Sequence, residues 1–341
     1  MWKFLILITL VGTLLAACQT GFRDISQELP VQKISQTNMG KYTGIAWPSE
    51  EIIAVVIDES NLMEQDSPTS YRPKIGVLDT ASNKLTLVQI DPKCKSYSVR
   101  SFQVLPNQQV GYIFKCPELG FRTHIIQAMD LTSVTSTDLY TESIIGRINE
   151  FSYSGDMKDL ILVDVEGPYT KSSLLHFDSR GKKTNITPDF LRADFPAWSS
   201  RINLIAFLGT KRYPNNQQEY KSWREIENLL HYPWQIYLYN PESLTTEELP
   251  LDVVDPLKLE WSPDGTMLAF SGEYKGVPGV WIVSNLNDRS NLTIIRVVNG
   301  LATFDFSPDS KSIAFAYIGL QNTEKQNTLY VVDIDAQNVS P

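Results

Sequence analysis

Two segments in the last third of the sequence are near-copies of each other. Residues 259–270 read LEWSPDGTMLAF, and residues 304–315 read FDFSPDSKSIAF. Their aromatic residues Trp261 and Phe306 lie about 45 positions apart, a period typical of propellers with one four-stranded blade per repeat. The repeat predicts an all-β fold, a β-propeller. It leaves the function open, because propellers serve in binding, scaffolding and catalysis.

Each repeat contains four short apolar runs that predict strands. In the copy around Trp261 these cover residues 259–261, 267–270, 280–284 and 291–298. The Ser-Pro-Asp-Gly segment after Trp261 suits a tight turn, because Pro fixes φ, Asp bonds nearby backbone and Gly adopts φ > 0. The runs are apolar on both faces, as expected where a blade lies between two neighbours.

Four weaker copies precede these two. The residue that ends the first strand of each copy forms a column: Trp47, Leu105, Tyr153, Trp198, Trp261 and Phe306. The third strands end in residues that start turns: Asp79, Asp130, Asp178, Asn240, Ser284 and Asp333. The six copies predict a six-bladed propeller with four antiparallel strands per blade, forming one domain over residues 41–341.

The last copy supplies only three strands. Its third strand is expected at residues 330–335, and no fourth follows before Pro341. An open ring would leave two exposed strand edges, which are hazards for pairing with other chains. We expect residues 29–34 to provide the missing strand, so that residues 18–40 form a tether and a closing strand. The alternative is a disordered tether.

These repeats resemble the TolB-type, WD40-like propeller repeat. The resemblance rests on the Ser-Pro-Asp-Gly turn, the Ile-Ala-Phe strand at residues 313–315 and a third strand ending in Val-Asp at residues 332–333. It is closest in the last two repeats and extends over about residues 41–335. It implies a platform that binds proteins or ligands, of a kind often found in the bacterial cell envelope.

The N-terminal residues predict a lipoprotein signal peptide over residues 1–17. Lys3 precedes a short apolar run at residues 4–14, followed by LAAC at residues 15–18. The run is too short for a comfortable membrane span, and small residues before a cysteine resemble the bacterial lipobox. We expect export, lipidation of Cys18 and anchoring in the bacterial cell membrane, with Gln19 favouring the outer membrane where one exists. The alternative is a plain secretory signal.

The remaining cysteines predict a disulfide. Cys94 lies in the connection that enters the second blade, and Cys116 closes the second strand of that blade. Antiparallel pairing brings these two positions to the same rim, in a compartment where disulfides persist. The alternative is two buried free thiols.

Charge and residue types argue against several classes of function. The net charge of −9 makes nucleic acid an unfavourable partner. The three histidines, His124, His176 and His231, have no metal-ligand spacing, and no Gly-x-Ser-x-Gly elbow is present. Glu260 and Asp305 lie on inner strands and are candidate channel carboxylates. We expect no catalytic residue, metal or cofactor, and interpret these acids as solvated channel residues.

Two connections are much longer than the others. Residues 59–72 and 209–232 join the second and third strands of the first and fourth blades, which are opposite each other in a six-membered ring. The second contains a helical stripe, which predicts a short helical insertion in blade four. That helix either packs on the rim or presents Trp223 to a partner. The candidate contacts in the two insertions are Tyr71, Tyr213, Tyr220 and Trp223.

The leading hypothesis is a lipid-anchored propeller that binds an envelope protein or a glycan on the face with the insertions. Loops carry function on rigid scaffolds more often than the scaffold itself. A second hypothesis is a carbohydrate-active enzyme, a lyase or glycosidase, that uses channel carboxylates. A third is a purely structural envelope component.

Overall fold

The structure, a computed structural model, describes residues 22–334 apart from residue 25 and the segments 27–28, 38–39, 59–72, 89–96, 117–122, 144–146, 167–170, 212–233, 289–290 and 320–322. The elements of these ranges are β-strands, with the single exception of the one-turn helix α3 (Thr323–Gln326). No helix in the described ranges is long and apolar enough to cross a membrane. The predicted all-β class is confirmed, and the expected helical insertion lies outside the described residues.

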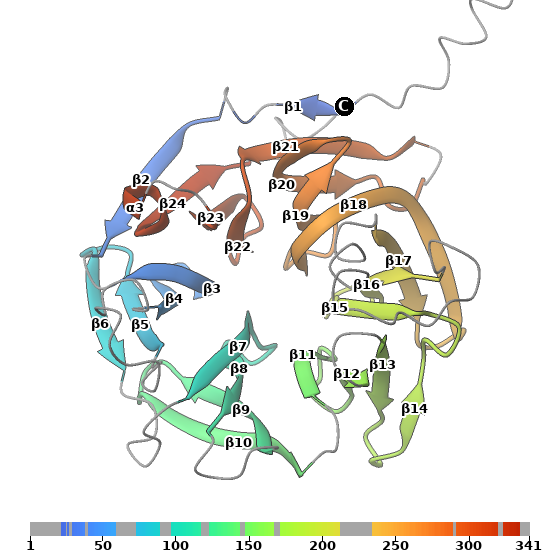
Figure 1. The fold of residues 1–341 in the computed structure, drawn as a ribbon. Helices are drawn as coiled ribbons and strands as arrows, with labels where there is room; N and C mark the ends of the chain where they lie inside the picture. Colours follow the sequence, from blue (N-terminus) through green and yellow to red (C-terminus); the bar gives the residue numbers. More distant parts are fainter. Residues whose placement is uncertain are drawn as a thin grey trace, which may run out of the picture.

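The sheets stand side by side in a ring around a common centre (Figure 1). The first contains β3 (Lys41–Ser49), β4 (Ile52–Asp58), β5 (Lys74–Asp79) and β6 (Lys84–Val88). The second contains β7 (Ser98–Val104), β8 (Val110–Lys115), β9 (Thr123–Asp130) and β10 (Thr135–Ser143). The third contains β11 (Arg147–Tyr153), β12 (Leu160–Glu166), β13 (Lys171–Phe177) and β14 (Lys183–Asn185). Each is an antiparallel meander whose first strand is innermost, as in a β-propeller.

An eight-stranded sheet continues the ring. It contains β15 (Arg192–Trp198), β16 (Ile205–Thr210), β17 (Trp234–Asn240), β18 (Thr245–Trp261), β19 (Leu268–Tyr274), β20 (Val277–Ser284) and β21 (Thr293–Asn299), with β1 (Arg23–Asp24) at its edge. The first part of β18 pairs with β17 and its last part with β19. This strand therefore passes without a break from the outer edge of one four-stranded array to the inner edge of the next.

The N-terminal strands close the ring. The last sheet contains β22 (Ala302–Phe306), β23 (Ser312–Tyr317), β24 (Thr328–Asp333) and β2 (Val31–Gln36). Strand β2 pairs antiparallel with β24, with Val31 opposite Val332, which is the pairing expected for residues 29–34. Strand β1 adds a parallel contact on β21 that the sequence did not predict.

The turn after each innermost strand is built the same way in four copies. At residues 262–265, Ser262 Oγ donates to Asp264 Oδ1 over 2.6 Å, and Gly265 N donates to Ser262 O over 2.8 Å. Gly265 has φ +73°, in the left-handed region. Gln108 and Met157 in two weaker copies, and Ser310 in the last copy, adopt the same conformation, so the turn persists where its glycine does not.

The core lies between neighbouring sheets. Ile282 of β20 clusters with Phe304 of β22 and Phe315 of β23, all buried. Trp281, on the opposite face of β20, belongs to a second cluster that contains Trp234 of β17. Because strands are buried on both faces, the alternation of polar and apolar residues is lost, as the sequence predicts. The rigid ring positions the innermost strands around the channel.

Candidate functional site

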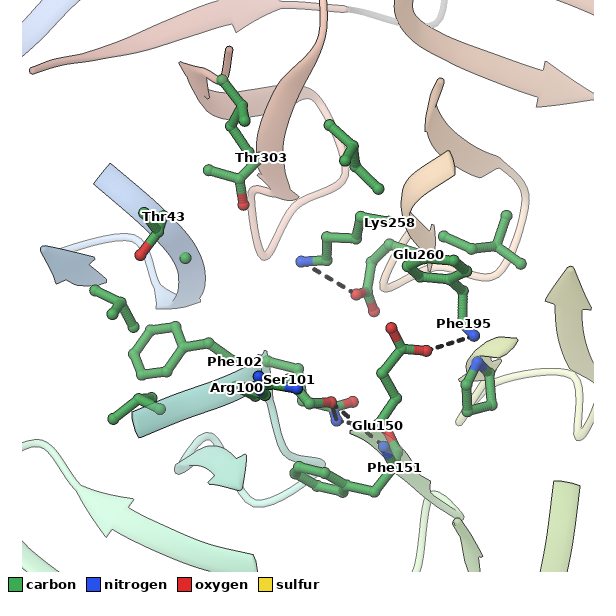
Figure 2. Close-up of a pocket in the computed structure, with 18 residues that line it drawn as sticks. Thr43, Arg100, Ser101, Phe102, Glu150, Phe151, Phe195, Lys258, Glu260 and Thr303 are labelled. Atoms are coloured by element: carbon green, nitrogen blue, oxygen red, sulfur yellow. Dashed lines mark hydrogen bonds and ion pairs between the residues drawn. The ribbon is translucent and has the colours of Figure 1, made fainter. Parts of the chain in front are cut away.

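The innermost strands β3, β7, β11, β15, β18 and β22 all contribute to one cavity of about 200 Å³. We call this cavity, lined by Thr43, Phe102, Glu150, Phe195, Lys258, Glu260 and Thr303 among others, the upper pocket (Figure 2). A second cavity of about 250 Å³, the lower pocket, is lined by the residues that end the innermost strands and by the turns that follow them. Gln103 and Glu260 line both, so the two pockets meet at these side chains.

The column of residues that end the first strand of each repeat lies around the lower pocket. Its lining includes each of the six predicted column residues, Trp47, Leu105, Tyr153, Trp198, Trp261 and Phe306. Most of their surface is buried between sheets, so the column serves mainly as core. The predicted carboxylates Glu260 and Asp305 also line this pocket.

β-Bulges direct side chains into the upper pocket. The register shifts between Arg100 and Gln103 in β7, between Ile148 and Phe151 in β11, and between Asp194 and Ala197 in β15. A bulge breaks strand alternation and re-aims the residues within it. Ser101 and Phe195 have φ of 49° and 55° at these places, and a bulky residue in the left-handed region is strained. Such strain commonly accompanies functional sites.

Glu150 lies in the bulge of β11. Its carboxylate accepts a hydrogen bond from the backbone N–H of Phe195 in β15. Burial and the nearby charge of Asp194 raise the pKa of Glu150 to about 8, although Arg192 and Arg100 act in the opposite direction. Glu150 is therefore largely protonated at neutral pH.

Lys258, Glu260 and Asp305 form a second charged group. Lys258 Nζ donates to Phe304 O over 2.8 Å and lies 3.3 Å from Glu260 Oε2 and 3.9 Å from Asp305 Oδ1. Burial raises the pKa of Glu260 to about 7 even beside this ammonium, and the charge of Asp305 adds to the rise. The Glu260 side chain nevertheless keeps 25% of its surface exposed to the channel.

Asp305 has a different environment. It is 4% exposed, and its Oδ2 and Oδ1 accept hydrogen bonds from Trp47 N over 2.7 Å and Phe306 N over 2.9 Å. Burial raises its pKa, opposed by Lys258 and these two donors. The carboxylate thus links β22 to β3, whereas Glu260 remains available to a ligand.

Arg192 and Asp194 lie on β15, next to Glu150 of β11. Arg192 Nη2 contacts Asp194 Oδ2 at 2.8 Å, and the guanidinium lies 4.6 Å from the centre of the Trp234 ring. Burial raises the pKa of Asp194 in spite of Arg192. Figure 2 shows the carboxyl groups of Glu150 and Glu260 reaching into the cavity toward one another. Two carboxyl groups with raised pKa values can hold a ligand or exchange a proton near neutral pH.

Sequence reasoning missed Glu150 and Lys258, although a signal was present. The residue three positions before each column residue lines the upper pocket: Gly44, Phe102, Glu150, Phe195, Lys258 and Thr303. In β18 and β22 regular pairing puts this residue on the same face as Glu260 and Asp305. In β7, β11 and β15 it lies within a bulge. An alignment of the six repeats on their column residues would therefore have identified the residues that line the upper pocket.

Several predicted residues lie outside the described part of the chain. These are Cys18, Tyr71, Cys94, Tyr213, Tyr220, Trp223 and His231. Cys116 is buried at 1% exposure directly after β8. His176 Nε2 lies 3.1 Å from Asp159 Oδ2, and the His176 ring packs edge-on against Trp198 with the ring centres 5.7 Å apart. Within the described ranges no group of three His, Cys, Asp or Glu residues is placed to hold a metal ion.

Solved structures similar to this one are propellers with little sequence identity. TolB from Acinetobacter baumannii is 14% identical with a TM-score of 0.54, over 83% of this chain and 63% of that chain. An oligogalacturonate lyase from Vibrio parahaemolyticus is 11% identical with a TM-score of 0.53, over 93% and 97%. The fold is that of a TolB-like β-propeller.

A gluconolactonase from Xanthomonas campestris is also similar, at 11% identity and a TM-score of 0.53 over 91% of each chain. No family model matches the sequence, and no curated protein matches it. This TolB-like propeller spans less than two thirds of the TolB chain. Because the neighbours differ in function, the similarity carries the fold alone.

Proposed function

We propose that this chain is a lipid-anchored protein of the bacterial envelope, a TolB-like platform that binds a protein or glycan partner at the mouth of its channel. The observation that carries the proposal is the upper pocket, where charged side chains meet in a cavity built by all the innermost strands. Buried charges are costly, and binding of a polar partner is a reason for a fold to retain them.

The described residues that flank the two insertions lie at the same end of their strands as the upper pocket. Lys41, near the pocket residue Thr43, pairs with Asp58, after which residues 59–72 follow. Arg192 pairs with Thr210 in the same way, just before residues 212–233. We infer that Tyr71, Tyr213, Tyr220 and Trp223 surround this mouth and supply aromatic contacts, which are frequent interface hot spots.

We infer six blades and a short helical insertion in the fourth. Six innermost strands line the channel, and the eight-stranded sheet divides at β18 into two four-stranded arrays. The helical spacing of Tyr220 and Trp223 supports the insertion. An experimental structure with seven blades, or with an extended segment at residues 217–231, would contradict this inference.

We also infer a lipid on Cys18 and a disulfide between Cys94 and Cys116. The lipobox-like residues 15–18 support the first, and burial of Cys116 at a rim position supports the second. A bridge over this separation would add about 3 kcal/mol in the chain-entropy model. Mass spectrometry of exported protein should show acyl chains on Cys18 and a two-proton gain on reduction. Intact exported protein with two free thiols would disprove the bridge.

The binding function is tested by partner capture. Trp223→Ala and Tyr220→Ala proteins, carrying a photo-crosslinker at the channel mouth, are incubated with envelope fractions and compared with wild type. Leu244→Ala is the matched control, because Leu244 is 72% exposed in the β17–β18 connection at the opposite end of the strands. We expect the first two to lose crosslinked partner at an unchanged melting temperature and the control to retain it. Equal capture by all three would refute the proposed face.

A second candidate is a carbohydrate-active enzyme, a lyase or glycosidase. It is favoured by the raised pKa values of Glu150 and Glu260, because acid–base catalysis needs a carboxyl group that is protonated near neutral pH. The test is a panel of neutral and acidic polysaccharides assayed for reducing ends and unsaturated products. Activity that Glu260→Gln abolishes would support the enzyme, and absence of turnover on the whole panel would leave the binding platform.

A further inference from the structure

Acidic side chains outnumber their cationic partners around the upper pocket. Four carboxylates gather there: Glu150, Asp194, Glu260 and Asp305. Two cations contact them, with Arg192 at 2.8 Å from Asp194, and Lys258 shared between Glu260 and Asp305. Arg100 on β7 also lines the cavity and acts on Glu150 through its charge. Four carboxylates therefore face three cations, and one negative charge stays uncompensated when all four carboxylates are ionised.

The uncompensated charge falls on the two carboxyl groups that face the cavity. Asp194 is held by Arg192, and Asp305 by two backbone N–H groups. Glu150 accepts a hydrogen bond from Phe195 N, and no salt bridge to it occurs among the described residues. Glu260 shares its one ammonium partner with Asp305 and a backbone carbonyl. Glu150 and Glu260 thus converge on the same space with spare capacity to accept hydrogen bonds (Figure 2).

The remaining walls of the cavity are largely apolar and aromatic. They include Val99, Phe102, Phe151, Phe195, Pro196 and Leu257. An alkyl chain packs well on such surfaces, and a cation over a Phe face gains a further attraction. The cavity of about 200 Å³ exceeds by far the 10–15 Å³ that one water molecule requires. Carboxylates at the centre and apolar walls around them match a charged head on an aliphatic stem.

We propose that the upper pocket binds an organic cation, an ammonium or guanidinium group on an alkyl chain, between the carboxylates of Glu150 and Glu260. The inference rests on the proposed binding function and names the chemistry that its channel recognises. Two sources share this chemistry, a small amine and a lysine or arginine side chain inserted by a partner protein. The charge and shape of the cavity are the same for both.

Binding of a cation is coupled to proton release. The pKa values of about 8 for Glu150 and about 7 for Glu260 mean that both carry protons over part of the neutral range. A bound cation favours the ionised carboxylates and lowers both pKa values. The charges that face Glu150 are those of Asp194, Arg192 and Arg100, and the charges that face Glu260 are those of Lys258 and Asp305. Affinity should rise from pH 6 to pH 9, up to tenfold per pH unit for each proton released.

The first experiment measures binding of n-butylammonium and n-butylguanidinium to the full chain by calorimetry at pH 6, 7, 8 and 9. Buffers of different ionisation enthalpy report the protons released. We expect saturable binding that strengthens with pH, and none of n-butanol or butyrate. Failure of both cations to bind at pH 8, or affinity that falls with pH, overturns the proposal. So does a Ca²⁺ affinity that exceeds that of the amines and excludes them from the pocket.

Variants locate the site. Glu150→Gln and Glu260→Gln should each lower affinity at pH 8 at least tenfold and remove one released proton, while Glu51→Gln, an exposed acid in the β3–β4 turn, should match wild type. Melting temperatures are measured for all three, and the Gln variants are expected to fold because they delete a buried charge. Unchanged affinity in both pocket variants refutes the assignment.

A third comparison separates the two sources and the two proposals. A blocked pentapeptide with one central lysine that binds more tightly than n-butylammonium indicates a partner's side chain, and the reverse indicates a small amine. Loss of amine binding in Glu150→Gln with normal partner capture would confine the cation to a small molecule. If the wild-type protein binds no amine yet captures its partner, the cation site is refuted and the platform proposal is kept. If amines bind while Trp223→Ala still captures the partner, the proposed platform face is refuted and the cation site is kept.

Discussion

The tight turn that follows an innermost strand ends with a residue in the left-handed conformation. This residue is Gly265 with φ +73° in one repeat and Gln108 with φ +64° in another. A non-glycine residue in this conformation costs about 1 to 2 kcal/mol. The Ser-Pro-Asp-Gly motif made the turn predictable in the last copies, but the weaker copies concealed it, because hydrogen bonds of the turn hold other residues in the same geometry.

Gln108→Gly should raise the free energy of unfolding by up to about 1 kcal/mol, since relief of the left-handed strain exceeds the entropy that glycine loses. Gly276→Ala, at φ +78° with open space around it, should lower it by about 1 kcal/mol. Gly265→Ala should cost more, because the added Cβ would lie 3.0 Å from Arg201 Cβ. Urea unfolding of the three variants provides the measurement, and a destabilised Gln108→Gly would contradict the argument.

Glu150 and Glu260 make stability fall as the pH rises. Their folded pKa values of about 8 and about 7 exceed the ordinary value of 4.5, so the folded state binds protons more tightly than the unfolded chain. Their unfavourable contribution is absent below pH 4.5 and grows until each folded pKa is passed. Relative to wild type, Glu150→Gln should gain stability between pH 5 and pH 9, on the order of 1 kcal/mol per pKa unit. A constant difference between the two unfolding curves across this range would show that Glu150 has an ordinary pKa.

At the scale of elements, innermost strands of neighbouring sheets are joined by side chains as well as by packing. Ser152 of β11 accepts a hydrogen bond from Trp198 N of β15 over 2.9 Å, and Asp305 of β22 accepts one from Trp47 N of β3. The sequence predicted these strands and the column along them. It could not predict the bulge that places Glu150, because a bulge depends on pairing between strands rather than on local residue preference.

Ser152→Ala should lower the free energy of unfolding by about 1 to 3 kcal/mol, since the buried N–H of Trp198 loses its acceptor. Ser200→Ala serves as the control, because Ser200 is exposed in the β15–β16 turn. Thermal and urea unfolding compare the two proteins. Equal stability of both variants would mean that water or a local shift replaces the lost acceptor.

At the scale of the whole molecule, β2 near the start of the described residues and β24 near their end lie in one sheet. The early end of the last repeat made this closure predictable, and β2 pairs with β24 accordingly. Strand β1 was not predictable, because it is two residues long and depends on the Asp24–Arg296 ion pair and the contact of Phe22 with Trp281. These contacts join residues that are far apart in the sequence, and a local sequence pattern cannot predict such contacts.

Deletion of residues 19–36 should lower the melting temperature strongly, because it removes β2 and exposes β24 as a strand edge. Deletion of residues 19–28 removes β1 but keeps β2 and the buried Leu29, and it should cost much less. Differential scanning calorimetry of both truncated proteins measures the difference. A melting temperature equal to that of wild type in the longer deletion would show that β2 does not stabilise the ring.

The parallel pairing of β1 with β21 also has a mechanical consequence. Tension applied to the chain ahead of Phe22 would reach β1 before it reached β2. The backbone contacts at Arg23 and Asp24 and the Asp24–Arg296 pair would therefore have to open first. Strand β1 would thus detach before the tension acted on β2, the closing strand of the propeller.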